Sequence, residues 1–491
     1  MGAGTAFAAA NTGCVERVEA ERIVSGEPSV AVELLLRLDG LVVQNAQLAA
    51  HNASLTERVE ELERRARRSS RTSHVPPSSD GPGVPRRPSK PPSERSRGGQ
   101  PGHPGSYRAL CAAPDTTVEV APTACAGCGG LLDEDAVVGV GGRHQVWEIP
   151  APRALVTEYR LQRCRCTRCG AATTATLPLG VPTGMFGPNL EAAIIGLSLS
   201  ERVSRRRVCE VVAELCGVQV ALGTIDRILA RAADAFAPAV AAIDDELHRA
   251  ACRSVDETSW RVAGRRSWAW AATTPRAVRF RLLNSRGRDS CHALLGEHPT
   301  GVITTDRWAV YNHLPLNQRQ ICWAHLARDF RAQAEKPGRV GQIATRLVAT
   351  TSRMCIAWKQ HRGDRVVLAA TLEPVRAALE HDLDLLAQCG EDSAAAEFAL
   401  NLIILDNALW TFVANQAVEP TNNAVERALR PIVIHRKTSY GTQTDHGSSV
   451  YEALQSIVQT LRHQHRDVYA WLRDALQAAH HQQPLPAIIS G

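Results

Sequence analysis

The sequence predicts a multidomain α/β protein, with a helical N-terminal segment, a cysteine-containing module and a mixed α/β domain in that order. Three observations support this prediction. Leucine recurs at every seventh position near the N-terminus, two C-x-x-C pairs lie in the first half of the chain, and strand-like runs begin after residue 250. With 491 residues, 44% of them apolar, the chain can form about three or four domains with packed cores.

The N-terminal segment, residues 1–63, contains a leucine heptad. The d residues are Leu34, Leu41, Leu48, Leu55 and Leu62, and the a residues are Ala31, Leu38, Asn45, Asn52 and Val59. Leucine at d with asparagine at some a positions favours a parallel two-stranded coiled coil in one register. We therefore predict a homo-oligomer that forms through this coil. The alternative is one amphipathic helix that packs on its own chain.

Residues 64–109 are predicted to be a basic linker. Residues 64–108 contain eleven Lys or Arg residues against Asp80 and Glu94, a local charge of +9, while the whole chain carries +6, so the rest sums to −3. Nine prolines and many Ser and Gly residues prevent this segment from packing a core. A basic, extended segment on a nearly neutral body favours contact with nucleic acid, and a solvated linker is the alternative.

Neither a secretory signal nor a membrane-spanning segment is expected. The N-terminus lacks a basic start followed by a long apolar core. The most apolar stretch, residues 399–418, is interrupted by Asn401, Asp406 and Asn407, which predicts a buried helix instead. Fourteen cysteines without a secretion signal favour reduced thiols and a metal site over a disulfide framework. We expect a cytoplasmic protein.

Residues 110–175 are predicted to form a zinc-binding module. Its C-x-x-C pairs, each followed by glycine, are Cys125 with Cys128 and Cys166 with Cys169. Such tight turns let backbone amides approach the thiolates, and four sulfur atoms make a closed tetrahedral site for structural Zn²⁺. The stretches between the pairs alternate like strands of a small hairpin. Cys164 is a spare thiol that could replace Cys166, and four free thiols are the alternative to zinc.

Residues 180–245 are predicted to be helical. One amphipathic segment ends at Cys216 and Gly217, and a second opens at Thr224. A helix, a glycine turn and a second helix resemble a DNA-reading helix-turn-helix. Helical hairpins that bind nothing share this pattern, so DNA reading and simple packing both remain open.

The domain predicted from residue 250 to 470 combines strands and helices. Three runs, RSVDETSW, RRSWAWAATT and AVRFRLLN, predict an antiparallel meander. A helix from Arg288 to Leu295, the apolar strand GVITTD and the strand–helix unit QICWAHLARDFRA follow. This order suits a ribonuclease H-like mixed sheet. Residues 335–415 are expected to be a helical insertion, and residues 471–491 a C-terminal tail.

Two aspartates, Asp256 in VDET and Asp306 in TTDRW, are each predicted to end an apolar strand. Carboxylates at neighbouring strand ends converge on one edge of a sheet, where they can hold hard divalent cations. Two such cations, about 3.5–4 Å apart, stabilise the attacking and leaving oxygens in phosphodiester transfer. Glu257 should point to the opposite face of its strand, which makes it the weaker candidate.

A third carboxylate, Glu426, lies in TNNAVERALRP. A short helix is predicted there, capped by Thr421 or Asn422 and ending before Pro431. Its apolar stripe consists of Ala424, Val425, Ala428 and Leu429, and its polar side of Asn422, Asn423, Glu426, Arg427 and Arg430. From the helix alone, an exposed ion pair between Glu426 and Arg430, worth about 0.2–0.5 kcal/mol, is the simpler explanation of the glutamate.

Together, VDET, TTDRWAVY, CWAHLARDF and TNNAVERALRPIVIHRK resemble the transposase family of Insertion Sequence 66, a bacterial group of the DDE type. The resemblance covers nearly the whole chain, because the leucine heptad, the PPSSD and GGQPGHPG stretches, the paired cysteines and the Asn-Asn-x-x-Glu-Arg unit occur in the family's order. The chain departs from the family at Arg307 and Trp308, where Gly and Tyr are usual, at His435, where Gly is usual, and in SRTSHVPP of the linker.

The resemblance implies a ribonuclease H-like core whose acidic triad holds two Mg²⁺ or Mn²⁺ ions. Carried onto this sequence, the triad is Asp256, Asp306 and Glu426. Metal-bound water would cut the transposon end, and the freed 3′-hydroxyl would attack target DNA. The residues implied in DNA contact are Arg427, Arg430, Arg436, Lys437, His325 and Arg328. For His325, a structural role at the start of a helix is the alternative.

The implied function is therefore metal-dependent cleavage at transposon ends, followed by strand transfer. The implied partners are DNA, a second copy of the chain and accessory transposition proteins, at the nucleoid of a bacterial cytoplasm. A catalytically inactive relic that binds transposon ends is the alternative. A third interpretation is a structural protein that acts through its zinc module and coiled coil.

Overall fold

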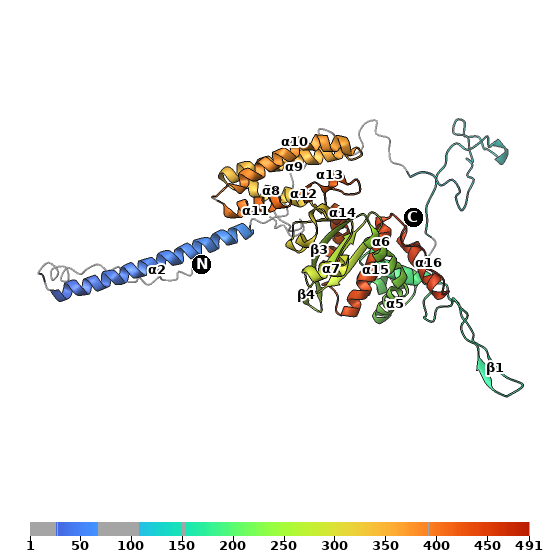
Figure 1. Cartoon of the computed structure of the whole chain (residues 1–491). Helices are drawn as coiled ribbons and strands as arrows, with labels where there is room; N and C mark the ends of the chain where they lie inside the picture. Colours follow the sequence, from blue (N-terminus) through green and yellow to red (C-terminus); the bar gives the residue numbers. More distant parts are fainter. Residues whose placement is uncertain (1–25, 27, 67–107, 150–152, 391, 491) are drawn as a thin grey trace, which may run out of the picture. The chain divides into compact units, whose positions relative to one another are not determined.

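The computed structural model describes residues 26, 28–66, 108–149, 153–390 and 392–490 (Figure 1). The chain divides into two units, residues 1–84 and 85–491, and each is described by itself. The predictions made for residues 1–25 and for most of the linker lie outside the described residues. Within the described ranges, every helix is too short or too polar to cross a membrane.

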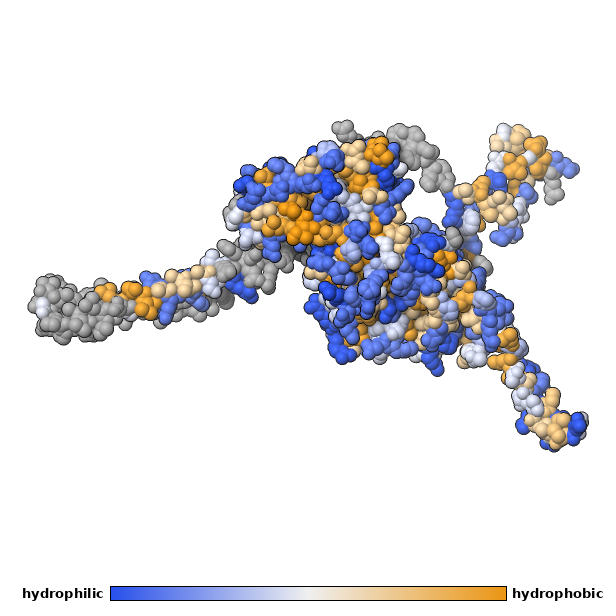
Figure 2. All heavy atoms as spheres, in the orientation of Figure 1, coloured by the Kyte–Doolittle hydropathy of each residue, from blue (hydrophilic) through white to orange (hydrophobic). Residues whose placement is uncertain are grey.

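The described part of the first unit is one helix, α2 (Pro28–Ala66). Leu41, Leu48 and Leu55, three of the predicted d residues, are at least half exposed on it. Figure 2 shows apolar side chains along this helix. Exposed leucines at heptad spacing are the surface that a second helix would bury. The coiled coil stays a prediction, because the structure contains a single chain.

A five-stranded mixed sheet lies at the centre of the second unit. Its strands are β3 (Cys252–Val262), β4 (Arg265–Thr273), β5 (Val278–Leu283), β6 (Val302–Thr305) and β7 (Arg319–Ile321). In space the order is β5-β4-β3-β6-β7. The first three strands are antiparallel, which confirms the predicted meander, and β6 and β7 run parallel to β3. Between β5 and β6 the chain passes through α7 (Arg288–Leu295), as parallel pairing requires.

The two faces of the sheet belong to different cores, because side chains alternate along each strand. One face of the sheet packs in a core that contains Trp260 of β3, which we call the first core. The opposite face packs in a second core, which contains Val255 of β3. The second core also contains α7 and the 3₁₀ turn η4 (Ala309–His313). Asp256 therefore faces the first core and Glu257 the second, as the sequence predicts.

Helices from both ends of this unit cover the first face of the sheet. They are α3 (Pro188–Ile195), the π-helical turn η3 (Gly196–Ser200), α4 (Arg205–Cys216), α5 (Leu222–Ala235), α6 (Ala237–Arg249), α14 (Asn423–Ser439), α15 (Asp445–His463) and α16 (Val468–His480). Residues 471–491, expected to be a tail, instead begin within α16 and bury Trp471, Leu472 and Ile488 in this core. The helical segment at 180–245 shares the same core and is not separate from the sheet.

After β7 the chain forms α8 (Trp323–Ala334), and the predicted helical insertion at 335–415 follows it. The helices of the insertion are α9 (Gly338–His361), α10 (Arg365–Ala387), α11 (Ser393–Ile404), α12 (Asp406–Leu409) and α13 (Thr411–Ala414). Their core also contains α8 and residues of the sheet, Val302 of β6 and Ile321 of β7. The single buried helix predicted over 399–418 is wrong, because the chain breaks at Leu405 and Trp410. Asp406 stabilises the break, since its carboxylate accepts the Trp410 indole N–H at 3.1 Å.

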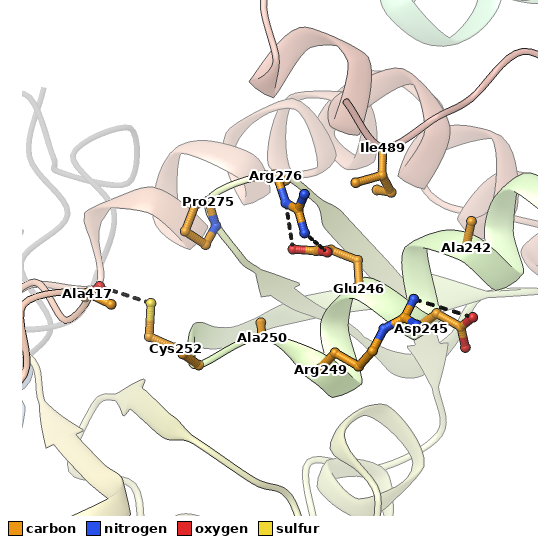
Figure 3. A pocket seen from close by; sticks show the side chains of 11 residues that line it. Ala242, Asp245, Glu246, Arg249, Ala250, Cys252, Pro275, Arg276, Ala417 and Ile489 are labelled. Carbon is orange, nitrogen blue, oxygen red and sulfur yellow. Dashed lines mark hydrogen bonds and ion pairs between the residues drawn. The ribbon is translucent and has the colours of Figure 1, made fainter. Parts of the chain in front are cut away.

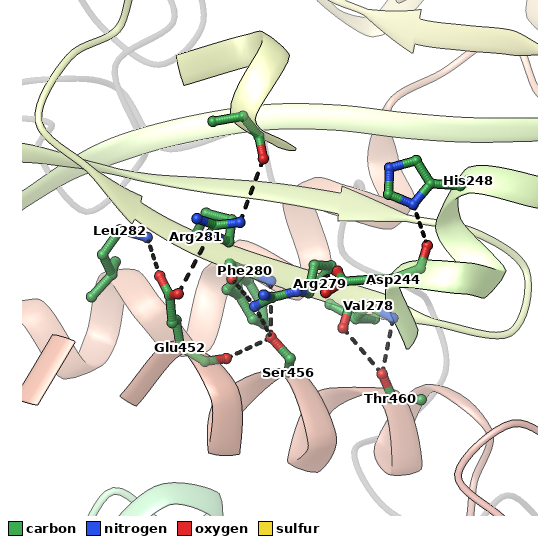
Figure 4. A network of polar contacts seen from close by, with 11 residues as sticks. Asp244, His248, Val278, Arg279, Phe280, Arg281, Leu282, Glu452, Ser456 and Thr460 are labelled. Carbon is green, nitrogen blue, oxygen red and sulfur yellow. Dashed lines mark hydrogen bonds and ion pairs between the residues drawn. The ribbon is translucent and has the colours of Figure 1, made fainter. Parts of the chain in front are cut away.

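Helix α15 satisfies the backbone of the edge strand β5 through a ladder of three side chains (Figure 4). This α15 ladder consists of Glu452, Ser456 and Thr460, which accept the N–H groups of Leu282, Phe280 and Val278 at 2.8, 3.0 and 3.0 Å. Four residues of helix rise about 6 Å and two residues of strand about 6.6 Å, so the spacings match. The ladder occupies backbone donors that an edge strand otherwise exposes to pairing with another chain.

We predict that Ser456→Ala lowers the free energy of unfolding by about 1–3 kcal/mol, because it leaves the buried Phe280 N–H without an acceptor. Denaturant unfolding of the full chain measures the change. The control is Ser449→Ala on the exposed side of the same helix, which should change stability by less than about 0.5 kcal/mol. Equal effects of the two substitutions would contradict the role given to the ladder.

Candidate active site

The pairing register of two parallel strands places Asp256 beside Asp306. Ser254 of β3 lies opposite Thr304 of β6, and two residues further along each strand come the two aspartates. Asp306 directly follows β6, as predicted, but the prediction that Asp256 ends its strand is wrong, because β3 continues to Val262 in its pairing with β4. Both side chains are half-buried. The structure therefore brings together the two aspartates that the sequence singled out.

Asn422 attaches the start of α14 to this edge of the sheet. The residue is completely buried. Its side-chain Nδ2 donates to the Val255 carbonyl at 2.8 Å, next to Asp256, and its backbone N–H donates to Cys322 Sγ at 3.1 Å. Asn422 stands at the N-cap position, but its side chain makes no capping hydrogen bond: the donation from Nδ2 to Val255 directs the amide toward the sheet, and Oδ1 has no hydrogen-bond partner among the described residues. Its predicted place on the polar side of the helix is wrong.

Helix α14 also continues beyond its predicted end. It runs from Asn423 to Ser439 and contains Pro431, which was expected to follow it. Proline removes one helical hydrogen bond, and tertiary packing must compensate for the loss. Ile432, the next residue, is completely buried in the first core and provides such packing.

Glu426 lies in the first turn of α14, and its partners come from α8. Arg328 Nη2 lies 3.2 Å and His325 Nε2 3.6 Å from Glu426 Oε1. The Glu426 side chain is 34% exposed, so it can reach a ligand. Among the ion pairs of the described residues, those of Glu426 are with His325 and Arg328 of α8, and none is with Arg430. The structure thus does not support the simple i,i+4 pair.

The carboxylates repel one another across this edge. Burial raises the pKa of Asp256 well above its usual range, and the negative charges of Glu257, Asp306 and Glu426 raise it further. A divalent cation would offset this repulsion, and oxygen ligands of this kind are the set that Mg²⁺ or Mn²⁺ takes. The residues present therefore fit the metal ions implied by the sequence.

Glu257 is satisfied on the opposite face of β3. Its carboxylate accepts hydrogen bonds from Arg286 Nε at 2.6 Å and from the Tyr311 hydroxyl at 2.7 Å. Burial and the charge of Asp306 raise the pKa of Glu257, and Arg286 and Tyr311 oppose that rise. Glu257 is thus a buried structural carboxylate, as its strand position predicted.

The turn after Asp306 is held by the residues that depart from the family. The Trp308 backbone N–H donates to Asp306 Oδ1 at 2.8 Å. The Arg307 guanidinium donates to Asp329 of α8 at 2.8 Å and to Asn401 of α11 at 3.3 Å. These contacts fix the turn against the insertion. The contacts of Arg307 with Asp329 and Asn401 were not predicted, because no local sequence pattern indicates which arginine side chain packs against the protein.

The buried side chain of Arg319 also holds the turn that follows β6. Arg319 of β7 has no exposed surface and donates to the Asp306 carbonyl at 3.0 Å and to Thr305 Oγ1 at 3.1 Å. Burial lowers its pKa to about 10, and Asp306 opposes that shift. Arg319 lies in the short strand Arg-Gln-Ile, whose pattern does not predict that the arginine is buried.

The basic residues predicted to contact DNA divide into two groups. Arg427, Arg430 and Lys437 are exposed on α14. Arg436 is half-buried and donates to Thr258 Oγ1 at 3.2 Å and to the carbonyl and hydroxyl oxygens of Ser259 on β3. Arg436 therefore joins α14 to the sheet within the protein, as Arg328 joins α8 to Glu426.

A pocket of roughly 560 Å³ opens at the other end of β3, beside Cys252 (Figure 3). Two ion pairs line it, Glu246 with Arg276 at 2.6 Å and Asp245 with Arg249 at 3.7 Å. Cys252 pairs with the first residue of β6, whereas Asp306 follows the last. The pocket is thus separate from the carboxylates.

The two cysteine pairs form the same backbone turn. Gly129 N–H donates to the Cys125 carbonyl at 2.8 Å, and Gly170 N–H donates to the Cys166 carbonyl at 2.9 Å. Both glycines have positive φ, 72° and 75°, a conformation that favours glycine. In each turn the backbone N–H of the second cysteine lowers the pKa of the first, and the N–H of the residue before it adds to this effect.

The second pair lies between two short strands, β1 (Arg163–Arg165) and β2 (Ala172–Thr174), which pair antiparallel. Cys164 lies in β1, outside the turn. Among the described residues, the four thiols do not come together as one group of ligand atoms. Each pair is therefore shaped as a half-site, and the joining of the halves remains a prediction.

Comparison with known proteins gives matches along most of the chain. The model of the zinc-finger binding domain of transposase IS66 matches residues 122–170, which supports structural zinc. A family of unknown function (DUF6444) matches residues 26–109. Uncharacterized protein y4qI of Sinorhizobium fredii (strain NBRC 101917 / NGR234) is 25% identical over 239 residues, 43% of each chain. Uncharacterized protein y4hP of that organism is 23% identical over 407 residues, 72% of this chain and 70% of its own.

The chain spans less than half the length of y4qI and of a second relative, y4jD, which is 23% identical over 226 residues. The longest family match covers the sheet, the insertion and α14. It extends over residues 183–450, more than half of the chain, and includes all three carboxylates. The chain belongs to the Transposase IS66 family.

Proposed function

We propose that this protein is a DNA transposase that cleaves DNA at transposon ends and joins the freed ends to target DNA. The observation that carries the proposal is that Asp306 and Glu426, from distant parts of the chain, lie close enough to Asp256 for their charges to raise its pKa, in addition to the larger effect of burial. A bound divalent cation would offset this repulsion. Perturbed carboxylates of this kind cluster at functional sites.

In the proposed mechanism, Asp256 and Asp306 would hold divalent cations from neighbouring strands, and Glu426 would complete the site from α14. When bound, Mg²⁺ or Mn²⁺ supplies Lewis acidity to the attacking and leaving oxygens of the phosphodiester. Asn422 positions Glu426 relative to Asp256. Arg328 compensates the charge of Glu426, and His325, with Nε2 3.6 Å from Glu426 Oε1, helps to orient it. No side chain forms a covalent intermediate with DNA.

We infer that the sheet is a ribonuclease H-like core. The strand order β5-β4-β3-β6-β7, with an antiparallel meander and two parallel strands, supports this inference. The placement of the carboxylates on β3, after β6 and on a following helix supports it as well. The helical insertion would then be an addition between the last strand and the glutamate helix.

DNA contact belongs to the same proposal. Arg427, Arg430 and Lys437 are exposed on the helix that carries Glu426, and such cations bind phosphates in a salt-dependent manner. The hairpin of α4 and α5 remains a candidate for DNA reading. The leucines of α2 would join two copies, accessory proteins would assist them, and the place of action would be the bacterial nucleoid.

The second candidate function is an inactive protein that binds transposon ends. The departure from the family at Arg307 and Trp308 favours it. Against it, Arg307 is held by Asp329 and Asn401, and the Trp308 N–H donates to Asp306. These contacts give the altered turn a defined conformation, so we favour the active enzyme.

We predict that Asp256→Asn, Asp306→Asn and Glu426→Gln each lower cleavage of labelled transposon-end DNA by at least about a hundredfold with Mg²⁺ or Mn²⁺. Metal-ion stabilisation is worth several kcal/mol, and each 1.36 kcal/mol changes the rate tenfold. The control is Asp289→Asn, an exposed carboxylate on α7, which should cleave like the wild type. Wild-type cleavage no better than that of Asp256→Asn would refute the catalytic proposal.

Thermal unfolding gives a second readout of the same substitutions. Because the folded protein raises the pKa of Asp256, its charge destabilises the metal-free state at neutral pH. Asp256→Asn should therefore raise the unfolding temperature without metal and abolish the rise that Mg²⁺ causes in the wild type. A Mg²⁺ effect that survives the substitution would place the cation elsewhere.

We also propose that Cys125, Cys128, Cys166 and Cys169 together bind one structural Zn²⁺. The support is the pair of matching turns, whose amides lower the pKa of the first thiol in each. Four thiolates make a closed tetrahedral site without room for substrate. Zinc here would stabilise the module and take no part in cleavage.

Metal analysis of the purified full-length protein tests the zinc ligands. Cys128→Ser should lose one zinc per chain, because three thiolates hold the ion far less tightly than four. Cys164→Ser, which removes an exposed thiol outside the turn, should keep the zinc. Loss of zinc in Cys164→Ser and its retention in Cys128→Ser would reverse the assignment.

A further inference from the structure

Three different metal-binding side chains meet beside the aspartate pair. Cys322 directly precedes α8, His325 lies in the first turn of α8, and Glu426 comes from α14. One ligand atom from each, a sulfur, a nitrogen and an oxygen, lies within 4.8 Å of the other two. Such a mixed set differs from the all-oxygen set of Asp256 and Asp306.

The surroundings of these side chains are preorganised. Cys322 is completely buried, and His325 is 6% exposed. The Asn422 backbone N–H donates to Cys322 Sγ at 3.1 Å, which fixes the direction of the sulfur. A backbone amide on a cysteine sulfur is also the feature of the two cysteine turns. Glu426, more exposed, leaves one side of the group accessible from solvent.

The distances suit a tetrahedral cation. Zinc binds sulfur at about 2.3 Å and nitrogen or oxygen at about 2.0–2.2 Å, so its ligand atoms lie about 3.4–3.6 Å apart. His325 Nε2 and Glu426 Oε1 are already 3.6 Å apart. Three protein ligands would leave a fourth position open. Sulfur and imidazole favour Zn²⁺ or Co²⁺ over Mg²⁺, which prefers oxygen ligands.

We propose that Cys322, His325 and Glu426 form a binding site for a thiophilic divalent cation of the zinc class. The cation replaces Arg328 as the counter-charge of Glu426, and the thiol proton of Cys322 passes to solvent on binding. Glu426 cannot serve this site and the aspartate site at once. Occupancy therefore withdraws the third carboxylate and inhibits cleavage, a consequence that rests on the proposed function.

Cobalt binding tests the site without reference to activity. Co²⁺ is added to the full-length protein with its cysteine turns loaded with zinc, and the sulfur-to-cobalt charge-transfer absorption is recorded. The wild type should bind one more thiolate-coordinated Co²⁺ per chain than the Cys322→Ser variant does. Excess Mg²⁺ should not displace this Co²⁺. Cys291→Ser removes another completely buried thiol and should keep the full absorption.

A second substitution tests the site independently, in case Cys322→Ser does not fold. Glu426→Gln changes a partly exposed side chain and leaves the sulfur in place. It should weaken Co²⁺ binding by more than about tenfold, since even second-shell changes cost 10–100-fold. Unchanged Co²⁺ affinity in Glu426→Gln, or identical spectra of the wild type and Cys322→Ser, would overturn the proposal.

Cleavage assays separate this proposal from the proposed function. Zn²⁺ added to a Mg²⁺ reaction should inhibit the wild type and spare Cys322→Ser. Inhibition that is equal in the two proteins overturns the competition for Glu426. If Co²⁺ binds as predicted but neither the wild type nor Cys322→Ser cleaves DNA under any condition, the proposed metal site is supported and the proposed transposase activity is refuted.

Discussion

The buried amide of Asn422 is the contact on which the geometry of the site depends. It links the strand that carries Asp256 to the helix that carries Glu426, and its backbone N–H links both to Cys322 at the start of α8. The Trp323 N–H strengthens this junction by donating to the Pro420 carbonyl at 2.9 Å. Residues far apart in the sequence thus meet through a few buried hydrogen bonds. Each would cost about 1–3 kcal/mol if one partner were left unsatisfied.

This junction holds together groups that repel one another. Burial raises the pKa of Asp256, and the charges of Glu257, Asp306 and Glu426 raise it further, so the carboxylates repel one another when no cation is bound. Three arginine side chains reduce this repulsion. Arg286 pairs with Glu257, Arg328 with Glu426, and Arg319 supports the backbone of Asp306. These contacts allow the fold to hold several carboxylates close together, and the cation of the proposed function would offset the remaining repulsion.

Much of the sheet was predictable, because the alternation of side chains on β3 to β5 is a local signal. Asp306 could be chosen because it follows a strand, and Asp256 was chosen on the same expectation although it lies in the interior of β3. Glu426 needed the family resemblance, since its helix alone suggested an ion pair. The continuation of α14 through Pro431 and the packing of α16 depend on distant core contacts, which no local pattern encodes. The roles of Asn422, Arg307 and Arg319 are of the same kind, since burial of a polar side chain is decided by its tertiary partners.

The most direct test of the account is a crystal structure of the full-length protein with Mn²⁺, in which anomalous scattering locates the metal. We expect anomalous peaks between Asp256 and Asp306, with a carboxylate oxygen of Glu426 among the ligands and the Asn422 amide still bonded to Val255. Mn²⁺ bound away from these aspartates, or Glu426 turned from an occupied site, would contradict the central claim.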